Sequence, residues 1–215
     1  MITLILGRRE LGKSTLALFI ARQTSTRVIF DPRKQYSTST AIFTGQVGPE
    51  FFEALDTRSE IIVQPTFNVI QTFEQMCEEL SDWIGENPNE PLTLLVDEAR
   101  FVETSSGINP YFDWILRCTP RKTVNVIFTA HRPVDIAVDI RSIADFWIMF
   151  HTTQEHDLKV IGERCGPQVE EIVRELKPQE LVIWNDSRAT YRKEMDRGKW
   201  FVPMYATMTT EEARQ

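Results

Sequence analysis

The chain has 215 residues, of which 42% are hydrophobic and 26% charged, and its net charge is −7 at pH 7. These values exclude a disordered chain, suffice for one α/β core, and argue against a protein that coats nucleic acid with its whole surface. No apolar run approaches the roughly 20 residues that cross a bilayer, so we expect a cytosolic protein with no membrane-spanning segment.

Short apolar runs alternate with helix-length segments along the chain. Strands are predicted at Thr3–Leu6, Arg27–Phe30, Ile61–Gln64, Leu92–Val96, Val124–Thr129, Asp145–Phe150 and Leu181–Trp184. Helices are predicted at Lys13–Gln23, Pro49–Leu55, Thr72–Gly85, Pro110–Cys118, Gln154–Arg164 and Pro167–Leu176. This alternation is typical of a three-layer α/β fold, with a mainly parallel sheet and helices on both faces. We expect one domain over residues 1–197 and a C-terminal tail over 198–215 that docks on the domain or on a neighbour.

A glycine-rich segment follows the first predicted strand and opens the first helix, as the Walker A pattern requires. Its residues are Gly7, Arg8, Arg9, Glu10, Leu11, Gly12, Lys13, Ser14 and Thr15. The glycines let backbone N–H groups turn towards phosphate oxygens, whose negative charge the helix N-terminus favours. Lys13 would reach the β- and γ-phosphates of ATP, and the Ser14 hydroxyl would bind Mg²⁺. The alternative is a glycine turn with an exposed lysine.

Two adjacent carboxylates, Asp97 and Glu98, end the strand at Leu92–Val96, as in a Walker B strand. Open α/β sheets bind ligands at the carboxyl ends of their strands. We predict that Asp97 holds Mg²⁺, mostly through water, and that Glu98 orients or deprotonates the attacking water. The alternative is that both acids cap the helix that follows.

Thr129 and His131 lie at the end of the strand at Val124–Thr129. If this strand lies beside the nucleotide, either residue can sense the γ-phosphate or the attacking water, because a neutral imidazole can donate a hydrogen bond to a phosphate oxygen. The alternative is a histidine that merely ends a strand.

In this order the motifs resemble those of the HerA/FtsK superfamily of DNA-pumping ATPases, over Met1 to about Trp184. The remaining features that carry the resemblance are a helix with arginines, then Arg132-Pro133, then the strand at Asp145–Phe150. In size, the chain is similar to the genome-packaging ATPases of membrane-containing, tectivirus-like viruses. The resemblance implies the RecA/FtsK-like P-loop NTPase fold, with ATP and Mg²⁺ as cofactors. The sequence departs from the family at His131, where many such motors have Gln.

The resemblance also implies an arginine finger that reaches a neighbour's nucleotide from the segment before the sensor strand. Arg117 and Arg121 are the candidates here, and the alternative is that they stabilise the helix C-terminus. A homo-oligomeric ring, with six subunits as the expected number, would enclose double-stranded DNA. Candidate DNA contacts are Arg33-Lys34, Arg100 with the loop Thr104–Asn109, and Arg188 to Lys199. Each could instead be a solvated basic stretch.

The favoured function is an ATP-driven motor that packages double-stranded DNA into a preformed virus capsid. Its partners would be capsid vertex or portal proteins, and it would lie in the host-cell cytoplasm or in the virion at a packaging vertex. A small-molecule P-loop kinase of the nucleoside or nucleotide type is one alternative, but the pair Asp97-Glu98 is better suited to activating water. A second is a phage assembly or secretion ATPase similar to zonula-occludens-toxin-like proteins, which carry a membrane-spanning segment. A third is a regulatory or scaffold protein that binds ATP without turnover.

Overall fold

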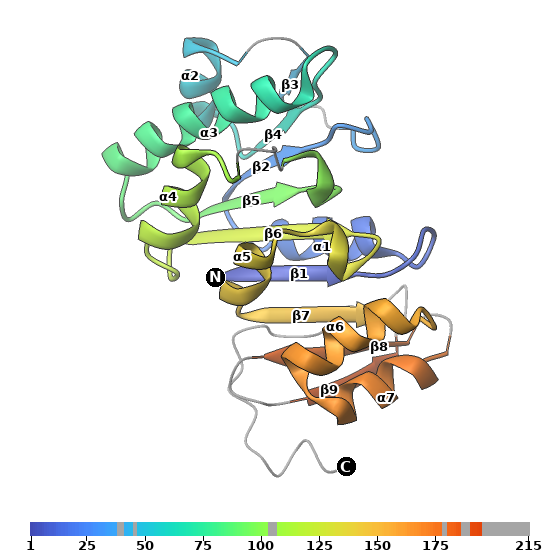
Figure 1. The fold of residues 1–215 in the computed structure, drawn as a ribbon. Coiled ribbons are helices and arrows are strands. Elements are labelled where there is room, and N and C mark those ends of the chain that lie inside the picture. Colours follow the sequence, from blue (N-terminus) through green and yellow to red (C-terminus); the bar gives the residue numbers. More distant parts are fainter. Residues whose placement is uncertain (38–40, 45–46, 103–106, 178–179, 186–189, 195–215) are drawn as a thin grey trace. The chain divides into compact units, whose positions relative to one another are not determined.

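The computed structural model describes residues 1–37, 41–44, 47–102, 107–177, 180–185 and 190–194, the last range as backbone (Figure 1). The chain divides into two compact units. The first consists of Met1–Ile2 and Ser14–Ala130, and the second of Thr3–Lys13 and His131–Gln215. The predicted tail at 198–215 lies outside the described residues.

The first unit contains five strands that all run parallel. They lie in the order β3 (Ala41–Phe43), β4 (Glu60–Val63), β2 (Thr26–Phe30), β5 (Leu92–Val96) and β6 (Val124–Ala130). Every residue of β4, β5 and β6 is buried, which explains why their sequences read as continuous apolar runs instead of alternating ones.

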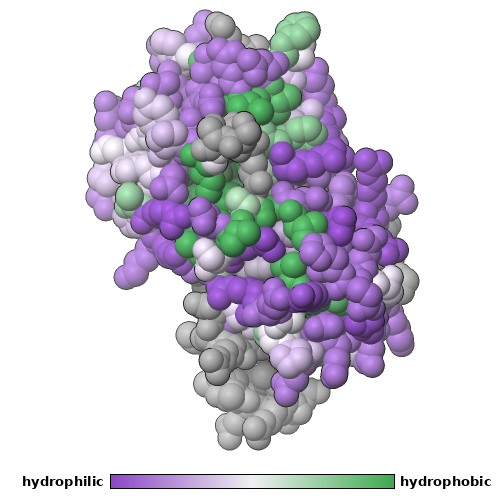
Figure 2. Space-filling model, in the orientation of Figure 1, coloured by the Kyte–Doolittle hydropathy of each residue, from purple (hydrophilic) through white to green (hydrophobic). Residues whose placement is uncertain are grey.

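Helices pack against both faces of these strands (Figure 1). They are α1 (Lys13–Ala21), α2 (Pro49–Thr57), α3 (Val69–Glu86), the short η1 (Ala99–Phe101) and α4 (Pro110–Cys118). Figure 1 shows α3 and α4 in front of the strands and α1 behind β6. The side chains of Asn68 and Asn109 accept hydrogen bonds from first-turn amides and so begin α3 and α4. Figure 2 shows mainly hydrophilic side chains over the outer sides of α3 and α4.

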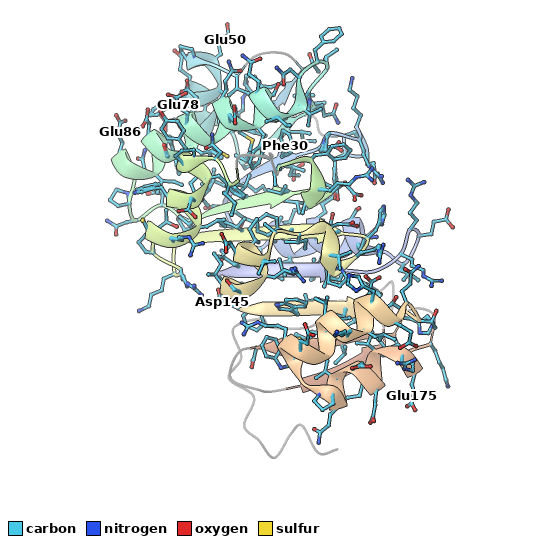
Figure 3. All side chains as sticks on the ribbon, in the orientation of Figure 1. Phe30, Glu50, Glu78, Glu86, Asp145 and Glu175 are labelled. Carbon is cyan, nitrogen blue, oxygen red and sulfur yellow. The ribbon has the colours of Figure 1, made fainter. Side chains whose placement is uncertain are left out.

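A chain of aromatic rings connects the strands of the first unit to α3 and α4. Phe30 (labelled in Figure 3) contacts Phe73 edge-to-face at 4.9 Å between ring centroids, and Phe73 contacts Phe112 at the same distance. Phe112 in turn contacts Phe128 of β6 at 5.8 Å. These rings belong to β2, α3, α4 and β6, so their packing fixes how these elements lie around the carboxyl ends of the strands.

The second unit contains a mixed set of strands. Their order is β1 (Ile2–Leu6), β7 (Phe146–Phe150), β8 (Glu180–Asn185) and β9 (Thr190–Glu194). β1 and β7 are parallel, whereas β8 is antiparallel to both β7 and β9. The helical segments are η2 (Pro133–Asp135), α5 (Val138–Ile143), α6 (Glu155–Cys165) and α7 (Pro167–Glu175). Figure 1 shows α6 and α7 on one side of β7 and β8.

The predicted α/β class with a mainly parallel sheet is confirmed, and each predicted strand and helix is present within a few residues of its expected bounds. Among the described residues, five elements were not predicted: β3, α5, β9 and the short helical segments η1 and η2. β3 has three residues and α5 has six, so neither is long enough to show a clear periodicity. No helix among the described residues is both long and apolar enough to cross a membrane.

Glu60, at the start of β4, forms ion pairs with two arginines of the first unit. Its carboxylate accepts hydrogen bonds from Arg22 (3.1 Å) and Arg27 (2.7 Å), and its side chain is 4% exposed. Burial raises the pKa of Glu60, but the hydrogen bonds from the two arginines outweigh burial and hold that pKa at about 2. The carboxylate therefore stabilises the fold above its unfolded pKa, and this contribution is lost as the pH falls towards 2.

We predict that Glu60→Gln lowers the free energy of unfolding by about 1 to 2 kcal/mol at neutral pH, after a discount for half-exposed Arg22. The deficit should shrink as the pH falls below about 4, where the native carboxylate also begins to lose its advantage. Urea unfolding at pH 7 and pH 3 measures both values, with exposed Glu90→Gln as the control. An equal deficit at both pH values would contradict this origin of the stabilisation.

Candidate active site

The phosphate loop joins β1 to α1, and its residues up to Lys13 belong to the second unit. Gly7 is buried against β7: a Cβ added to it would lie 2.7 Å from the Cβ of Phe150, closer than real side chains approach. Gly12 has a φ of 93°, in the left-handed region that favours glycine. Close packing at Gly7 and the positive φ at Gly12 thus explain why each position of the pattern needs glycine.

The residues between the two glycines are mostly open to solvent. Arg8, Arg9 and Glu10 are exposed and Leu11 is half-buried. The Arg8 guanidinium donates a hydrogen bond to the Thr153 hydroxyl at 3.2 Å. The exposed residues of this loop are open to solvent, and the role of the loop in binding phosphate stays a prediction.

Lys13 is 7% exposed, so the alternative of a glycine turn with an exposed lysine does not fit the structure. Its ammonium donates a hydrogen bond to the Arg8 carbonyl at 2.8 Å and lies 3.2 Å from Nδ1 of His131. Because an ammonium only donates, Nδ1 must be the acceptor, and a neutral His131 then carries its proton on Nε2. The structure therefore places the predicted sensor His131 on the predicted phosphate lysine.

In the first unit, four polar residues form a row at the carboxyl ends of β4, β2, β5 and β6. The register pairs Val63 with Phe30, Phe30 with Val96, and Val96 with Phe128. The residues that directly follow these strand positions are Gln64, Asp31, Asp97 and Thr129. All four are at most 8% exposed, so they form a buried polar edge.

Asp97 is the centre of that row. Its Oδ1 accepts hydrogen bonds from Thr129 Oγ1 at 2.7 Å, Ser14 Oγ at 3.3 Å and Tyr36 Oη at 3.3 Å. Burial raises the pKa of Asp97, and nearby Asp31 raises it further, although the hydrogen bond from Thr129 opposes this. A divalent cation would offset the cost of a buried charge here.

The predicted metal ligands fit Mg²⁺. The Ser14 hydroxyl and the Asp97 carboxylate are hard oxygen donors, which Mg²⁺ prefers, and they already lie 3.3 Å apart. Thr15, the last residue of the Walker A pattern, is exposed. Ser14 follows Lys13 directly in the sequence.

Glu98 is 3% exposed and has a left-handed backbone, with φ 64° and ψ 75°. Its carboxylate lies 3.3 Å from the Arg33 guanidinium and 3.6 Å from that of Arg100, and its N–H donates to Thr129 Oγ1 at 3.0 Å. A left-handed conformation costs a residue other than glycine about 1 kcal/mol or more, and such strain gathers at functional sites. In the described part of the chain, the Glu98 side chain makes no capping hydrogen bond to η1, so the capping alternative does not describe it.

Asp31, Gln64 and Tyr36 were not predicted as site residues. The Asp31 carboxylate accepts hydrogen bonds from the amides of Gln35 and Tyr36 and from the Gln64 side chain, at 2.8 to 3.0 Å. Asp31 could have been found, because it directly follows β2 just as Asp97 follows β5. Tyr36 could not, since it comes from the segment after β2, where no strand end indicates its position.

The two finger candidates lie at the opposite end of β6 from Thr129. Arg117 is in the last turn of α4 and pairs with Asp113 at 2.6 Å, and Arg121 is in the turn just before β6. Seven strand residues, at about 3.3 Å each, separate that turn from the polar edge. Neither arginine can reach Asp97 or Glu98 of its own chain, so a catalytic role would require a second copy.

The residues predicted to contact DNA have mixed outcomes. Arg33 and Arg100 both lie on Glu98, and the Arg100 guanidinium also packs over the Phe101 ring at 4.9 Å. Neither arginine is therefore merely solvated. Much of the loop at Thr104–Asn109 and of the stretch Arg188 to Lys199 lies outside the described residues.

Comparison with solved structures confirms the predicted P-loop NTPase fold. The genome packaging NTPase B204 from Sulfolobus turreted icosahedral virus 2, solved with AMPPCP, is 20% identical, with a TM-score of 0.74 over 90% of this chain and 97% of that one. B204 from Sulfolobus turreted icosahedral virus, a DNA-packaging ATPase, is 21% identical, with a TM-score of 0.73 over 91% and 98% of the chains. VirB4 of Thermoanaerobacter pseudethanolicus is 11% identical, with a TM-score of 0.66 over 90% and 88%.

No protein-family model matches the sequence, and no curated protein matches it either. At these identities the likeness is one of fold. The predicted resemblance to genome-packaging ATPases is thus confirmed at that level, and the chain is an α/β protein with the architecture of P-loop ATPases.

Thr129 connects the two carboxylate residues, because its hydroxyl donates to Asp97 and accepts from the Glu98 amide. We predict that Thr129→Val, which keeps the shape but removes the hydroxyl, lowers the free energy of unfolding by about 1 to 3 kcal/mol because it leaves both partners buried without that bond. Thr129→Ser should restore most of the loss. Urea unfolding of the three proteins measures it, and a valine variant as stable as the native chain would refute the role of the hydroxyl.

Proposed function

We propose that this chain is a nucleotide triphosphatase that binds ATP with Mg²⁺ and hydrolyses it. The observation that carries the proposal is the arrangement at the carboxyl end of β5. There, the Asp97 carboxylate accepts hydrogen bonds from the Ser14 and Thr129 hydroxyls. Buried Glu98 follows Asp97 directly and has a left-handed backbone conformation. A metal carboxylate next to a second carboxylate is the set that water activation at a γ-phosphate needs.

Each predicted residue has a role in this proposal. Lys13 and the amides of residues 7–13 bind the phosphate groups, while Ser14 and Asp97 hold Mg²⁺, which supplies charge neutralisation when it is bound. Glu98 polarises the attacking water. His131, on Lys13, is positioned to respond when the lysine turns to a phosphate. Thr129 orients the Asp97 carboxylate and holds the backbone amide of Glu98 instead of contacting substrate.

Hydrolysis is favoured over transfer to a small molecule. Buried Glu98, directly after the proposed metal ligand Asp97, is well suited to activating a water molecule, whereas a small-molecule kinase also needs an arginine-rich lid and an acceptor pocket. Glu98 also disfavours a scaffold that binds ATP without turnover, because such a protein needs no carboxylate that could activate water next to the metal ligand.

We further propose that hydrolysis drives translocation of double-stranded DNA, with packaging of a viral genome into a capsid as the task. Two solved structures with this fold are described as a genome packaging NTPase and a DNA-packaging ATPase, and both match this chain over at least nine tenths of both lengths. The position of Arg117 and Arg121, remote from the carboxylates of their own chain, supports a ring in which a neighbour completes the site. Capsid vertex or portal proteins would be its partners, in the host-cell cytoplasm or in the virion.

We predict that Glu98→Gln keeps nucleotide affinity within about twofold and lowers kcat by about 10² to 10⁴, because it removes the base but keeps the shape. Steady-state phosphate release and nucleotide binding measure the two effects. Glu86→Gln, an exposed glutamate at the end of α3 (labelled in Figure 3), is the control and should leave both unchanged. Normal turnover in Glu98→Gln would exclude Glu98 as the base.

We also predict that the ATPase rate per subunit rises with protein concentration and with double-stranded DNA. Either Arg117→Ala or Arg121→Ala should lower the stimulated rate by about 10³ or more, the loss expected of an arginine finger. Lys122→Ala is the matched control, since it removes a neighbouring cation from the same turn. A rate indifferent to concentration and DNA, with all three variants alike, would contradict the ring motor but not ATP hydrolysis itself.

A further inference from the structure

The segment from Asp31 to Tyr36, after β2, contacts both carboxylates of the candidate site. Tyr36 Oη donates a hydrogen bond to Asp97 Oδ1 at 3.3 Å and lies 3.4 Å from the Ser14 carbonyl. Three residues earlier, the Arg33 guanidinium lies 3.3 Å from Glu98 Oε2. One short stretch of backbone thus connects the predicted metal ligand to the predicted base.

The two ends of this segment are fixed to each other. Buried Asp31 accepts hydrogen bonds from the amides of Gln35 and Tyr36, and its backbone carbonyl accepts from the Lys34 amide at 3.2 Å. Gln64 donates to the Asp31 carboxylate and also to the Tyr36 carbonyl, each at 2.8 Å. Because these bonds close the segment into a compact turn, we expect a shift of Tyr36 to move Arg33 as well.

The contact between Arg33 and Glu98 places a positive charge beside a group of buried carboxylates. Asp31, Asp97 and Glu98 are all at most 3% exposed, and Arg33, whose side chain is 20% exposed, is a cation that reaches this group from the same segment. The Arg33 guanidinium lies against Oε2 of Glu98, where it takes a position that an attacking water would otherwise occupy. Water can therefore reach Oε2 more easily when Arg33 moves aside.

We propose that the Asp31–Tyr36 segment couples metal binding at Asp97 to the release of Glu98. Tyr36 occupies Asp97 while the carboxylate has no metal ion and leaves it when the carboxylate takes one up. The turn moves with Tyr36, and Arg33 then loosens from Glu98, which becomes able to receive water. Tyr36 and Arg33 are thus positioning residues, and they prevent the base from acting before the metal is present.

This inference rests on the proposed metal and base roles, so its test measures binding and needs no hydrolysis. The dissociation constant of the non-hydrolysable analogue AMPPCP is measured for the full chain with Mg²⁺ and with EDTA. The constant in EDTA divided by the constant in Mg²⁺ is the ratio that gives the contribution of the metal. Tyr36→Phe removes a competitor for Asp97, and Arg33→Gln removes the ion pair that must break. Each should raise the ratio about three- to tenfold.

The double variant distinguishes coupling from separate effects. If the segment connects the two contacts, Tyr36→Phe with Arg33→Gln should raise the ratio no further than the larger single effect, whereas independent sites would multiply. Lys34→Gln is the matched control. It removes an exposed cation from the same turn, and it should leave the ratio unchanged.

Each other result has a definite meaning. Multiplicative effects in the double variant would overturn the coupling and leave the proposed ATPase site intact. An equal rise of the ratio in Lys34→Gln and Arg33→Gln would do the same, because it would show that only the loss of a positive charge matters. A native chain whose affinity for AMPPCP does not depend on Mg²⁺, with Asp97→Ala behaving alike, would overturn the metal site and the coupling together. Urea unfolding of Tyr36→Phe and Arg33→Gln confirms that each variant is folded.

Discussion

The parallel register of β4, β2, β5 and β6 is the constraint on which the candidate site depends. Parallel strands in register end at the same edge, and here the residue that ends or follows each strand is polar. A shift of β5 by one residue would turn Asp97 to the other face and bring Val96 to its place. The aromatic contacts from Phe30 to Phe128 hold this register, because they tie β2 and β6 to α3 and α4.

Burying carboxylates at one strand edge is costly, and the first unit compensates for it locally. Asp31 receives amides and a glutamine side chain, Asp97 receives hydroxyl groups, and Glu98 lies against guanidinium groups. These hydrogen-bond and ion-pair partners differ in whether they can move away from the carboxylate. Amides from a closed turn are fixed, whereas hydroxyl and guanidinium groups sit on side chains that can move. The residues with a proposed chemical role are those whose partners can move aside.

In the second unit, the predicted phosphate loop is held by a few specific contacts. Gly7 allows the loop to lie against β7, and Lys13 satisfies the Arg8 carbonyl while it lies against His131. The carbonyl and the imidazole fix the position of the Lys13 ammonium. The ammonium is thus held in place before a ligand arrives, which lowers the entropic cost of binding.

The sequence by itself determined the fold class, and it located the glycine-rich loop before α1 and the two carboxylates after β5, because each depends on local patterns: apolar runs, glycine spacing and acids at a strand end. It also indicated that Arg117 and Arg121 come from the segment before β6. Only the tertiary structure decided that Tyr36 and Arg33 lie on Asp97 and Glu98, since the register of β2 against β5 brings together segments about 60 residues apart in sequence. No local pattern carries that information, and the geometry of the turn after β2 depends on Gln64 of another strand end.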